Sequence, residues 1–426
     1  MNDLHPRDQI LETMERIYRH RMTTTSGGNV SIRDESGEVW ITPARLDKGA
    51  LRRSDVVRVA ADGRWDGPIK PSSELPFHQA IYKARPDLGA IVHAHPAALV
   101  AFSMTRTIPE TRMFPQAWHI CGEVGFAPYA LPGSERLGDN IASEFAKGPS
   151  AVILENHGVV AGGETLTEAF QRFEALEFAA QTAIRARTLG ESHSLTDEQL
   201  ELPQSRRPDF APADPSRPTS REKELRRELS EFVRRGCQQR LLISTEGSYS
   251  ARLSESAFLI TPSQQDRYRL APQDIVRVDG DAAERGKQPS RASRCHQAIY
   301  ARHPQVNAIC FAHPIHATAF SVTGAAFESR TIPESYVVLR DLATIPFGQP
   351  YHDVAAVAEC VSLRTPAAIL ENDGVLVVGT SMLDAYDRLE VMEATAEALI
   401  FSRRIGEASP MPEPVIAELR SHFLGE

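Results

Sequence analysis

Apolar side chains recur every three or four positions near the start of the chain, between residues 10 and 18, and again between residues 225 and 233. This spacing places the apolar side chains on one face and predicts an amphipathic helix in each half. A longer pattern of the same kind spans residues 166–188 and residues 383–403. We therefore expect each half to open and to close with a helix.

Short apolar runs separated by turn residues lie between these helices. The clearest runs in the first half are residues 39–42, 56–59, 89–95 and 151–155. Runs of this length, bounded by Gly, Pro and Asp, are typical of β-strands. Helices that alternate with such strands predict a mixed α/β fold in which helices pack on a sheet.

The second half repeats the order of the first. Ile41-Thr42-Pro43 recurs as Ile260-Thr261-Pro262, and His78-Gln79-Ala80-Ile81-Tyr82 recurs as His296-Gln297-Ala298-Ile299-Tyr300. Six such ordered matches indicate a tandem duplication. We predict one domain over residues 1–190, a proline-rich, semi-extended linker over 191–219, and a second domain over 220–426.

Composition narrows the class of protein. The 426 residues are 42% hydrophobic and 24% charged, with a formal net charge of -9. These values are typical of a globular protein and argue against a nucleic-acid-binding one, which would carry a basic surface. The five cysteines form no CxxC pair, and neither a secretory signal nor a stretch of transmembrane length is present. We therefore expect free thiols, a cytoplasmic location and no membrane partner.

Three histidines of the first half are placed where they can bind one metal ion. His93 and His95 share a predicted strand, so their side chains point to the same face. His157 follows another strand in a turn before Gly158. Three histidine ligands leave one position open for substrate or water, the pattern of catalytic sites. An HxH pair alone is common in surface or core positions, so it does not by itself establish a metal site. His78 recurs in the second half as His296, which favours a scaffold role for His78 and His296.

A possible proton carrier precedes a predicted helix in the run Pro71-Ser72-Ser73-Glu74. The serines suit either helix capping or anion binding at the helix N-terminus. The second copy reads Pro289-Ser290-Arg291-Ala292, so a serine persists while Glu74 is replaced, and His93 becomes Phe311. The joint loss indicates a shared function of Glu74 and His93. The first copy is therefore metal-competent, and the second copy is degenerate.

These residues resemble the class II aldolase/adducin family. The resemblance is carried by Gly28-Asn29-Val30-Ser31, Ile41-Thr42-Pro43, Pro71-Ser72-Ser73-Glu74, His93-Ala94-His95 and Asn156-His157-Gly158. It implies two tandem α/β/α domains, each with a central mixed sheet. It implies a divalent metal, usually Zn²⁺ with Mn²⁺ or Co²⁺ as alternatives, held by His93, His95 and His157. Glu74 would be a resting ligand and the catalytic acid/base, and Asn29, Ser72 and Ser73 would hold a substrate phosphate.

Two departures from the family pattern change these expectations. The phosphate loop reads Thr42-Pro43-Ala44-Arg45, and Arg45 could pair with a carboxylate instead of a phosphate. Family aldolases take a tyrosine from a neighbouring subunit, and only the second copy has one at the matching place, Tyr336. We expect Tyr336 to complete the site of the active copy. We also expect a homo-oligomer, formed as a homodimer with a pseudo-fourfold ring.

The expected activity is a metal-dependent lyase of the aldolase type. It would cleave a carbon–carbon bond in a small hydroxy-carbonyl or sugar-phosphate substrate through a metal-stabilised enediolate. Alternatives are a decarboxylase of a small hydroxylated carboxylic acid, a sugar-phosphate epimerase, and a non-catalytic, adducin-like interaction protein, because a fold alone does not determine function.

Overall fold

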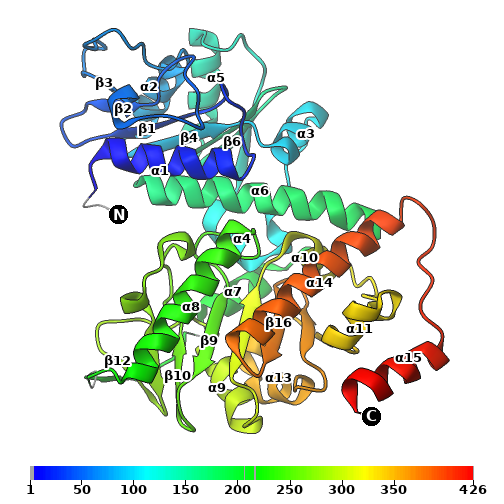
Figure 1. Cartoon of the computed structure of the whole chain (residues 1–426). Helices are drawn as coiled ribbons and strands as arrows, with labels where there is room; N and C mark the ends of the chain where they lie inside the picture. The colour runs from blue at the N-terminus through cyan, green and yellow to red at the C-terminus, as the bar shows by residue number, and fades with distance from the viewer. Residues whose placement is uncertain (1–3, 206, 215–216, 426) are drawn as a thin grey trace. The chain divides into compact units, whose positions relative to one another are not determined.

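The chain divides into two compact units in the computed structural model, which describes residues 4–205, 207–214 and 217–425. The first unit comprises residues 1–111 and 116–181, and the second comprises residues 112–115 and 182–426. Each unit holds its own sheet with helices packed on it (Figure 1). The mixed α/β class and the tandem arrangement expected from the repeat are confirmed.

Helices and strands are interspersed up to residue 189. They are α1 (Pro6–Arg19), β1 (Asn29–Arg33), β2 (Val39–Ile41), η1 (Arg53–Asp55), β3 (Val57–Val59), α2 (Leu75–Ala84), β4 (Ala90–Ala94), α3 (Ala97–Thr105), η2 (Thr111–Met113), α4 (Pro115–Cys121), β5 (Val124–Ala127), α5 (Glu135–Ala146), β6 (Ala151–Leu154), β7 (Gly158–Gly163) and α6 (Leu166–Leu189).

The first sheet has the strand order β3-β2-β1-β4-β7-β6-β5, so β4 lies at its centre. Its neighbouring strands are antiparallel except for β5 and β6. Side chains of α2 and α5, such as Phe77 and Phe145, pack with Ile91 of β4 in one buried cluster. Because side chains alternate along a strand, every second residue of β4 faces α2.

The second unit repeats this plan with additional elements. They are α7 (Asp197–Ser205), β8 (Ala211–Ala213), α8 (Ser220–Gln238), β9 (Ser248–Arg252), β10 (Ala257–Ile260), η3 (Arg267–Arg269), η4 (Pro272–Asp274), β11 (Val276–Asp279), β12 (Ala282–Glu284), α9 (Ser293–Arg302), β13 (Ala308–Ala312), α10 (Ile315–Ser321), η5 (Ser329–Thr331), α11 (Pro333–Leu339), β14 (Ala343–Ile345), α12 (Gln349–His352), α13 (Val354–Cys360), β15 (Ala367–Leu370), β16 (Gly374–Gly379), α14 (Met382–Ser402), α15 (Glu413–Leu419) and η6 (Arg420–Leu424).

Its sheet has the order β14-β15-β16-β13-β9-β10-β11-β12-β8. The first seven of these strands match the seven of the first sheet in the same neighbour order, and β13 is the counterpart of β4. The two additional strands extend the edge that β11 forms.

The segment between the copies differs from the expected semi-extended linker. It contains α7, in which Leu200 and Pro203 are buried, and β8, which pairs in parallel with β12. Burial of leucine stabilises the helix beyond its weak local propensity. Pro212 is accommodated because β8 is an edge strand, whose second side needs no hydrogen-bond donor.

Two expectations drawn from composition can be compared with the structure. All five cysteines are free thiols, and four of them are buried. Among the described residues, no helix combines the length and apolar character that crossing a membrane requires.

The glycines that end β7 and β16 generate a prediction about the fold. A Cβ atom built on Gly163 or Gly379 would lie 2.5 Å from the backbone nitrogen of Ala169 or Ala385, respectively. Replacing either glycine by alanine should therefore push the following helix away and lower the free energy of unfolding by about 1–3 kcal/mol. Urea unfolding measures the loss. Gly406→Ala, where a Cβ meets nothing within 4 Å, is the control, and equal stability of all three variants would contradict the prediction.

Candidate metal centre

The register of the first sheet places His93 beneath helix α2. His93 pairs with Asn29 of β1 and with Val160 of β7. The side chain of His93 points to the same face of β4 as that of Ile91, because the two residues are two positions apart on the strand. His93 is fully buried, and its ring lies 5.3 Å from the ring of Phe77 in α2. The imidazole is thus held on the α2 face by strands on both sides.

The other two histidines reach the same point from loops. His95 follows the end of β4, and His157 lies in the turn between β6 and β7, where Asn156 adopts a positive φ of 54°. The Nε2 atoms of His93 and His95 are 3.0 Å apart. One ring nitrogen from each of the three histidines lies within 4.8 Å of the others. The structure therefore brings together all three histidines singled out from the sequence.

Glu74 completes this cluster from the first position before α2. Its carboxylate oxygens lie 3.2 Å from Nε2 of His93 and 3.4 Å from Nε2 of His157. The Nδ2 group of Asn29 donates a hydrogen bond of 2.7 Å to the same carboxylate. Burial alone would raise the pKa of Glu74, but its electrostatic interactions with His93 and His157 and the hydrogen bond from Asn29 outweigh burial and hold that pKa well below its usual range. Glu74 is therefore a carboxylate rather than a neutral acid in this environment.

Glycines let the backbone approach the histidines closely. A Cβ on Gly27 would lie 2.9 Å from Nδ1 of His95, and one on Gly158 would lie 2.7 Å from Cδ2 of the same ring. Gly28 has a φ of 71°, and a Cβ there would meet the backbone oxygen of His93 at 2.8 Å. Each of these distances is shorter than side chains tolerate, so these positions have a steric reason to be glycine.

The donor set fits a divalent metal ion. Nδ1 of His93 lies 2.9 Å from the backbone oxygen of Val159, which can only accept a hydrogen bond, so Nδ1 carries the proton and Nε2 offers its lone pair to the cluster. Burial lowers the pKa of His95 to about 3 and that of His157 to about 4. Neutral imidazoles are the form that binds a metal. His93, His95 and His157 would hold the ion, with Glu74 beside it.

The residues expected to bind substrate are placed less uniformly. The amide of buried Asn29 is engaged by Glu74, and Oγ of Ser72 accepts a hydrogen bond from the backbone nitrogen of Glu74 at 3.3 Å. Ser73 and Arg45 are exposed, and Arg45 has a φ of 59°. Among the described residues, the guanidinium of Arg45 has no hydrogen-bond or ion-pair partner, so it is available to an anion.

Lys48 is a candidate that the sequence reasoning missed. Its side chain is only 3% exposed, and Nζ donates a hydrogen bond of 2.6 Å to the backbone oxygen of Pro43. Burial lowers the pKa of Lys48 to about 8. The backbone of Lys48 also binds Thr25 in the glycine-rich loop, where the hydroxyl of Thr23 is buried without a partner among the described residues. Because Asp47-Lys48-Gly49 looks like a solvated turn, no sequence pattern indicated this burial.

The corresponding positions of the second unit no longer suit a metal. Phe311 replaces His93, and its ring stacks on His296 with a centroid distance of 4.9 Å. Ala292 replaces Glu74, and Asp373 replaces His157. The ring of His313, the counterpart of His95, lies 3.6 Å from the carboxylate of Asp373.

Contacts between side chains of the second unit occupy the positions that match the histidine cluster. Arg291, at the position of Ser73, lies 3.1 Å from the carboxylate of Glu246, at the position of Gly27. The hydroxyl of Tyr351 donates a hydrogen bond of 2.6 Å to Asp373. The carboxylates of this site thus have partners within the chain.

Tyr336 lies in α11 and is 2% exposed. Its hydroxyl accepts a hydrogen bond of 2.6 Å from Nε of Arg420 in the C-terminal turn. The role of Tyr336 in the first unit's site therefore stays a prediction, and its hydroxyl would have to leave Arg420 to take it.

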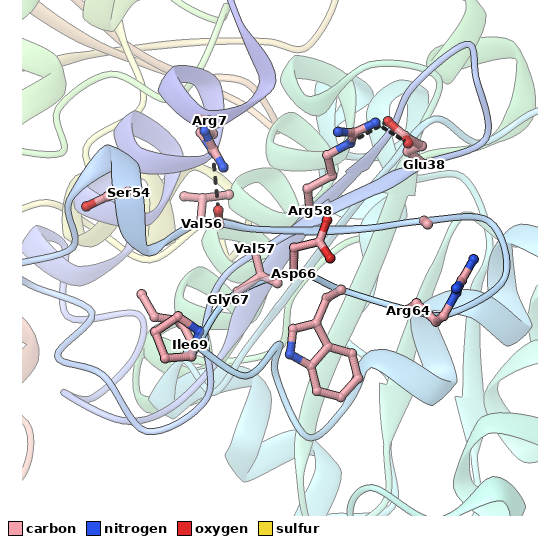
Figure 2. Close-up of a pocket in the computed structure, with 13 residues that line it drawn as sticks. Arg7, Glu38, Ser54, Val56, Val57, Arg58, Arg64, Asp66, Gly67 and Ile69 are labelled. Atoms are coloured by element: carbon pink, nitrogen blue, oxygen red, sulfur yellow. Dashed lines mark hydrogen bonds and ion pairs between the residues drawn. The ribbon is translucent and has the colours of Figure 1, made fainter.

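A separate cavity of about 390 Å³ lies at the β3 edge of the first sheet. Figure 2 shows Arg58 directed at Glu38 along one wall and the guanidinium of Arg7 above the backbone oxygen of Val56. Its described lining residues include Ser54 and two carboxylates, Glu38 and Asp66, but no histidine or cysteine. In the second unit, β12 and β8 pair along the corresponding edge. The histidine cluster therefore remains the candidate site.

Comparison with known proteins identifies the family of the chain. The family described as "Class II Aldolase and Adducin N-terminal domain" matches residues 8–184 and 227–400. A 5-deoxy-D-ribulose 1-phosphate aldolase of Bacillus thuringiensis is 34% identical, over 46% of this chain and 92% of its own length. A 3-oxo-tetronate 4-phosphate decarboxylase of Escherichia coli is 32% identical, over 41% of this chain and 84% of its own length.

Among solved structures, an L-fuculose 1-phosphate aldolase is 31% identical, with a TM-score of 0.43, over 46% of this chain and 93% of its own. Each of these relatives thus corresponds to less than half of the chain, whereas the family match occupies two separate segments. The chain belongs to the class II aldolase and adducin family and contains two copies of its domain.

Proposed function

We propose that the chain is a divalent-metal-dependent lyase that cleaves a carbon–carbon bond in a small anionic hydroxy-carbonyl compound at the first unit's site. The observation that supports this most is the convergence of His93, His95 and His157 within 4.8 Å beside the carboxylate of Glu74. Zn²⁺ is the favoured ion, because imidazole nitrogens with an adjacent open position are typical of catalytic zinc. When bound, the ion would stabilise the negative charge that bond cleavage leaves on the substrate.

Glu74 is the proton carrier in this proposal. It is ionised and lies against His93 and His157, so it can accept the proton of the substrate hydroxyl as the carbon–carbon bond breaks and deliver it to the enediolate carbon that cleavage leaves. In the reverse direction it would remove that proton. Its burial excludes bulk water from the carboxylate, which keeps the proton between enzyme and substrate. Asn29 holds one carboxylate oxygen, so the carboxylate remains aimed at the cluster.

The substrate is expected to carry an anionic group. Lys48 is buried beside the glycine-rich loop with a backbone oxygen as its hydrogen-bond partner, and the guanidinium of Arg45 is exposed. Buried cations are stabilised by a nearby anion. Phosphate and carboxylate both meet this requirement, so the substrate class includes sugar phosphates and hydroxy acids.

A decarboxylase is the second candidate. It is favoured by the similarity to 3-oxo-tetronate 4-phosphate decarboxylase and by Arg45, which suits a carboxylate. Both reactions leave a carbanion of the same kind, so the site cannot distinguish them by its ligands. Product analysis separates them, because a decarboxylase releases carbon dioxide and an aldolase releases an aldehyde.

The expected homodimer also stays a prediction.

Metal content is the first test of the proposal. We expect about one divalent ion per chain by elemental mass spectrometry, and loss of that ion in His95→Ala. His313→Ala, the counterpart change in the second unit, should leave the content unchanged because Phe311 and Asp373 have replaced its partners. A metal-free wild-type protein after supply of zinc would contradict the proposal, and two ions per chain would contradict a single metal site.

Glu74→Gln should separate metal binding from proton transfer. The amide keeps the size and the hydrogen-bond acceptor of the side chain but cannot carry the proton, so turnover should fall by about 100-fold or more. After supply of zinc, metal content should stay near one ion per chain because the three histidines remain, although the ion binds more weakly without the carboxylate. Turnover is measured with a panel of sugar phosphates and hydroxy acids, by aldehyde and carbon dioxide release. Turnover at the wild-type level would exclude Glu74 as the acid/base.

Tyr336→Phe tests the predicted contribution of the second unit. If the hydroxyl of Tyr336 serves the reaction, its loss should reduce turnover by about tenfold or more. Acid–base groups usually contribute about 100-fold to 10,000-fold, so a tenfold loss would be a small effect of this kind. Metal content should not change. Arg420→Lys is the matched control, because it alters the contact that holds the hydroxyl in the second unit while keeping the charge. Wild-type turnover of Tyr336→Phe would remove Tyr336 from the mechanism.

A further inference from the structure

A chain of buried hydrogen bonds runs from Glu74 into the core of the first unit. Asn29 donates to Glu74, and the Oδ1 atom of Asn29 contacts Nε2 of His78. Nδ1 of His78 lies 2.7 Å from Oγ of Ser31, which lies 2.8 Å from the hydroxyl of Tyr82. The four side chains beyond Glu74 are each at most 3% exposed.

The direction of each hydrogen bond follows from the carboxylate end. A carboxylate only accepts, so Asn29 must present Nδ2 to Glu74 and therefore Oδ1 to His78. Oδ1 also only accepts, so Nε2 of His78 must carry a proton. Because a neutral imidazole has a single N–H group, Nδ1 accepts from the hydroxyl of Ser31. Ser31 in turn accepts from Tyr82, which completes the order.

We infer that His78 and Asn29 are positioning residues for Glu74: the single N–H of His78 fixes the amide orientation of Asn29, and the amide fixes the carboxylate. The inference rests on the proposed role of Glu74. An amide does not readily pass a proton along, so the chain orients Glu74 rather than conducting protons to it. With His78 removed, the amide of Asn29 could rotate by half a turn and present Oδ1 to the carboxylate, which would repel it.

The second unit supplies a natural comparison. His296 lies 2.7 Å from Ser250, which lies 2.8 Å from Tyr300, so the inner part of the chain is retained. At the outer end, Ser248 replaces Asn29, with Oγ 3.0 Å from Nε2 of His296. Glu74 has become Ala292. The amide is therefore absent where no carboxylate has to be held, although the buried histidine persists.

The tyrosine end of this series of hydrogen bonds contacts an arginine in both units. Arg33 donates to the backbone oxygen of Tyr82 at 3.0 Å, and Arg252 donates to that of Tyr300 at 2.7 Å. The guanidinium of each arginine also lies over the ring of the same tyrosine, at 4.9 Å and 4.6 Å from its centroid. Removing either histidine should thus disturb its unit equally, so His296 provides a matched control for His78.

Three variants test the inference, with Co²⁺ as the probe. Asn29→Ser copies the second unit and keeps a hydrogen bond to His78 but removes the amide from Glu74. His78→Phe removes the N–H that orients the amide, and His296→Phe makes the same change in the second unit. We expect Asn29→Ser and His78→Phe to weaken Co²⁺ binding by about tenfold or more, as the loss of groups that orient metal-site residues does. His296→Phe should bind Co²⁺ as the wild type does.

A second readout does not depend on metal binding or turnover. Nitrogen-15 NMR of the metal-free protein should show His78 protonated at Nε2 and not at Nδ1. Protonation at Nδ1, unchanged Co²⁺ affinity of Asn29→Ser and His78→Phe, or an equal loss in His296→Phe would each overturn the inference. If the tautomer and the affinity losses are as expected but no substrate is cleaved, the proposed lyase activity fails while the positioning role stands.

Discussion

The pairing of β4 between β1 and β7 is the constraint on which the histidine cluster depends. It places His93 opposite Asn29 on one side, and on the other side next to Val159, whose backbone oxygen accepts the Nδ1 proton of His93. A slip of one residue would turn His93 to the opposite face, because side chains alternate along a strand. The tautomer of His93, its place beneath α2 and its approach to His95 all follow from this register.

Much of the fold and part of the site could be predicted from the sequence, for physical reasons that differ between residues. The sequence predicted that His93 and His95 share a face of one strand. The structure ends β4 at Ala94, before His95, and still brings the two rings together. Glu74 was indicated by its loss together with His93 in the second copy. By contrast, the partner of Asn29 could not be predicted, since an amide in a glycine-rich loop can bind many acceptors. The burial of Lys48 and the strand β8 depend on tertiary contacts that local patterns do not contain.

The two units show which parts of this architecture belong to the fold and which belong to chemistry. The hydrogen bonds from histidine through serine to tyrosine are kept in both, as is the arginine below them. They fill a buried polar region whose groups would be costly to leave unpaired. The residues that differ, such as Asn29 and Ser248, lie at the outer end, next to the metal-site positions. The two units therefore share this buried core and differ at the end that faces the histidine cluster of the first unit.

The ionic contacts of the second unit have a consequence for the history of the chain. Arg291 and Glu246 neutralise each other, and Phe311 covers His296. Restoring a carboxylate at Ala292 alone would place a further negative charge near Glu246 and Asp373, and restoring an imidazole at Phe311 alone would remove apolar packing. Each single reversal is thus unfavourable until several others have occurred. If the two copies arose from one metal-binding ancestor, these contacts would oppose a stepwise return to the three-histidine site.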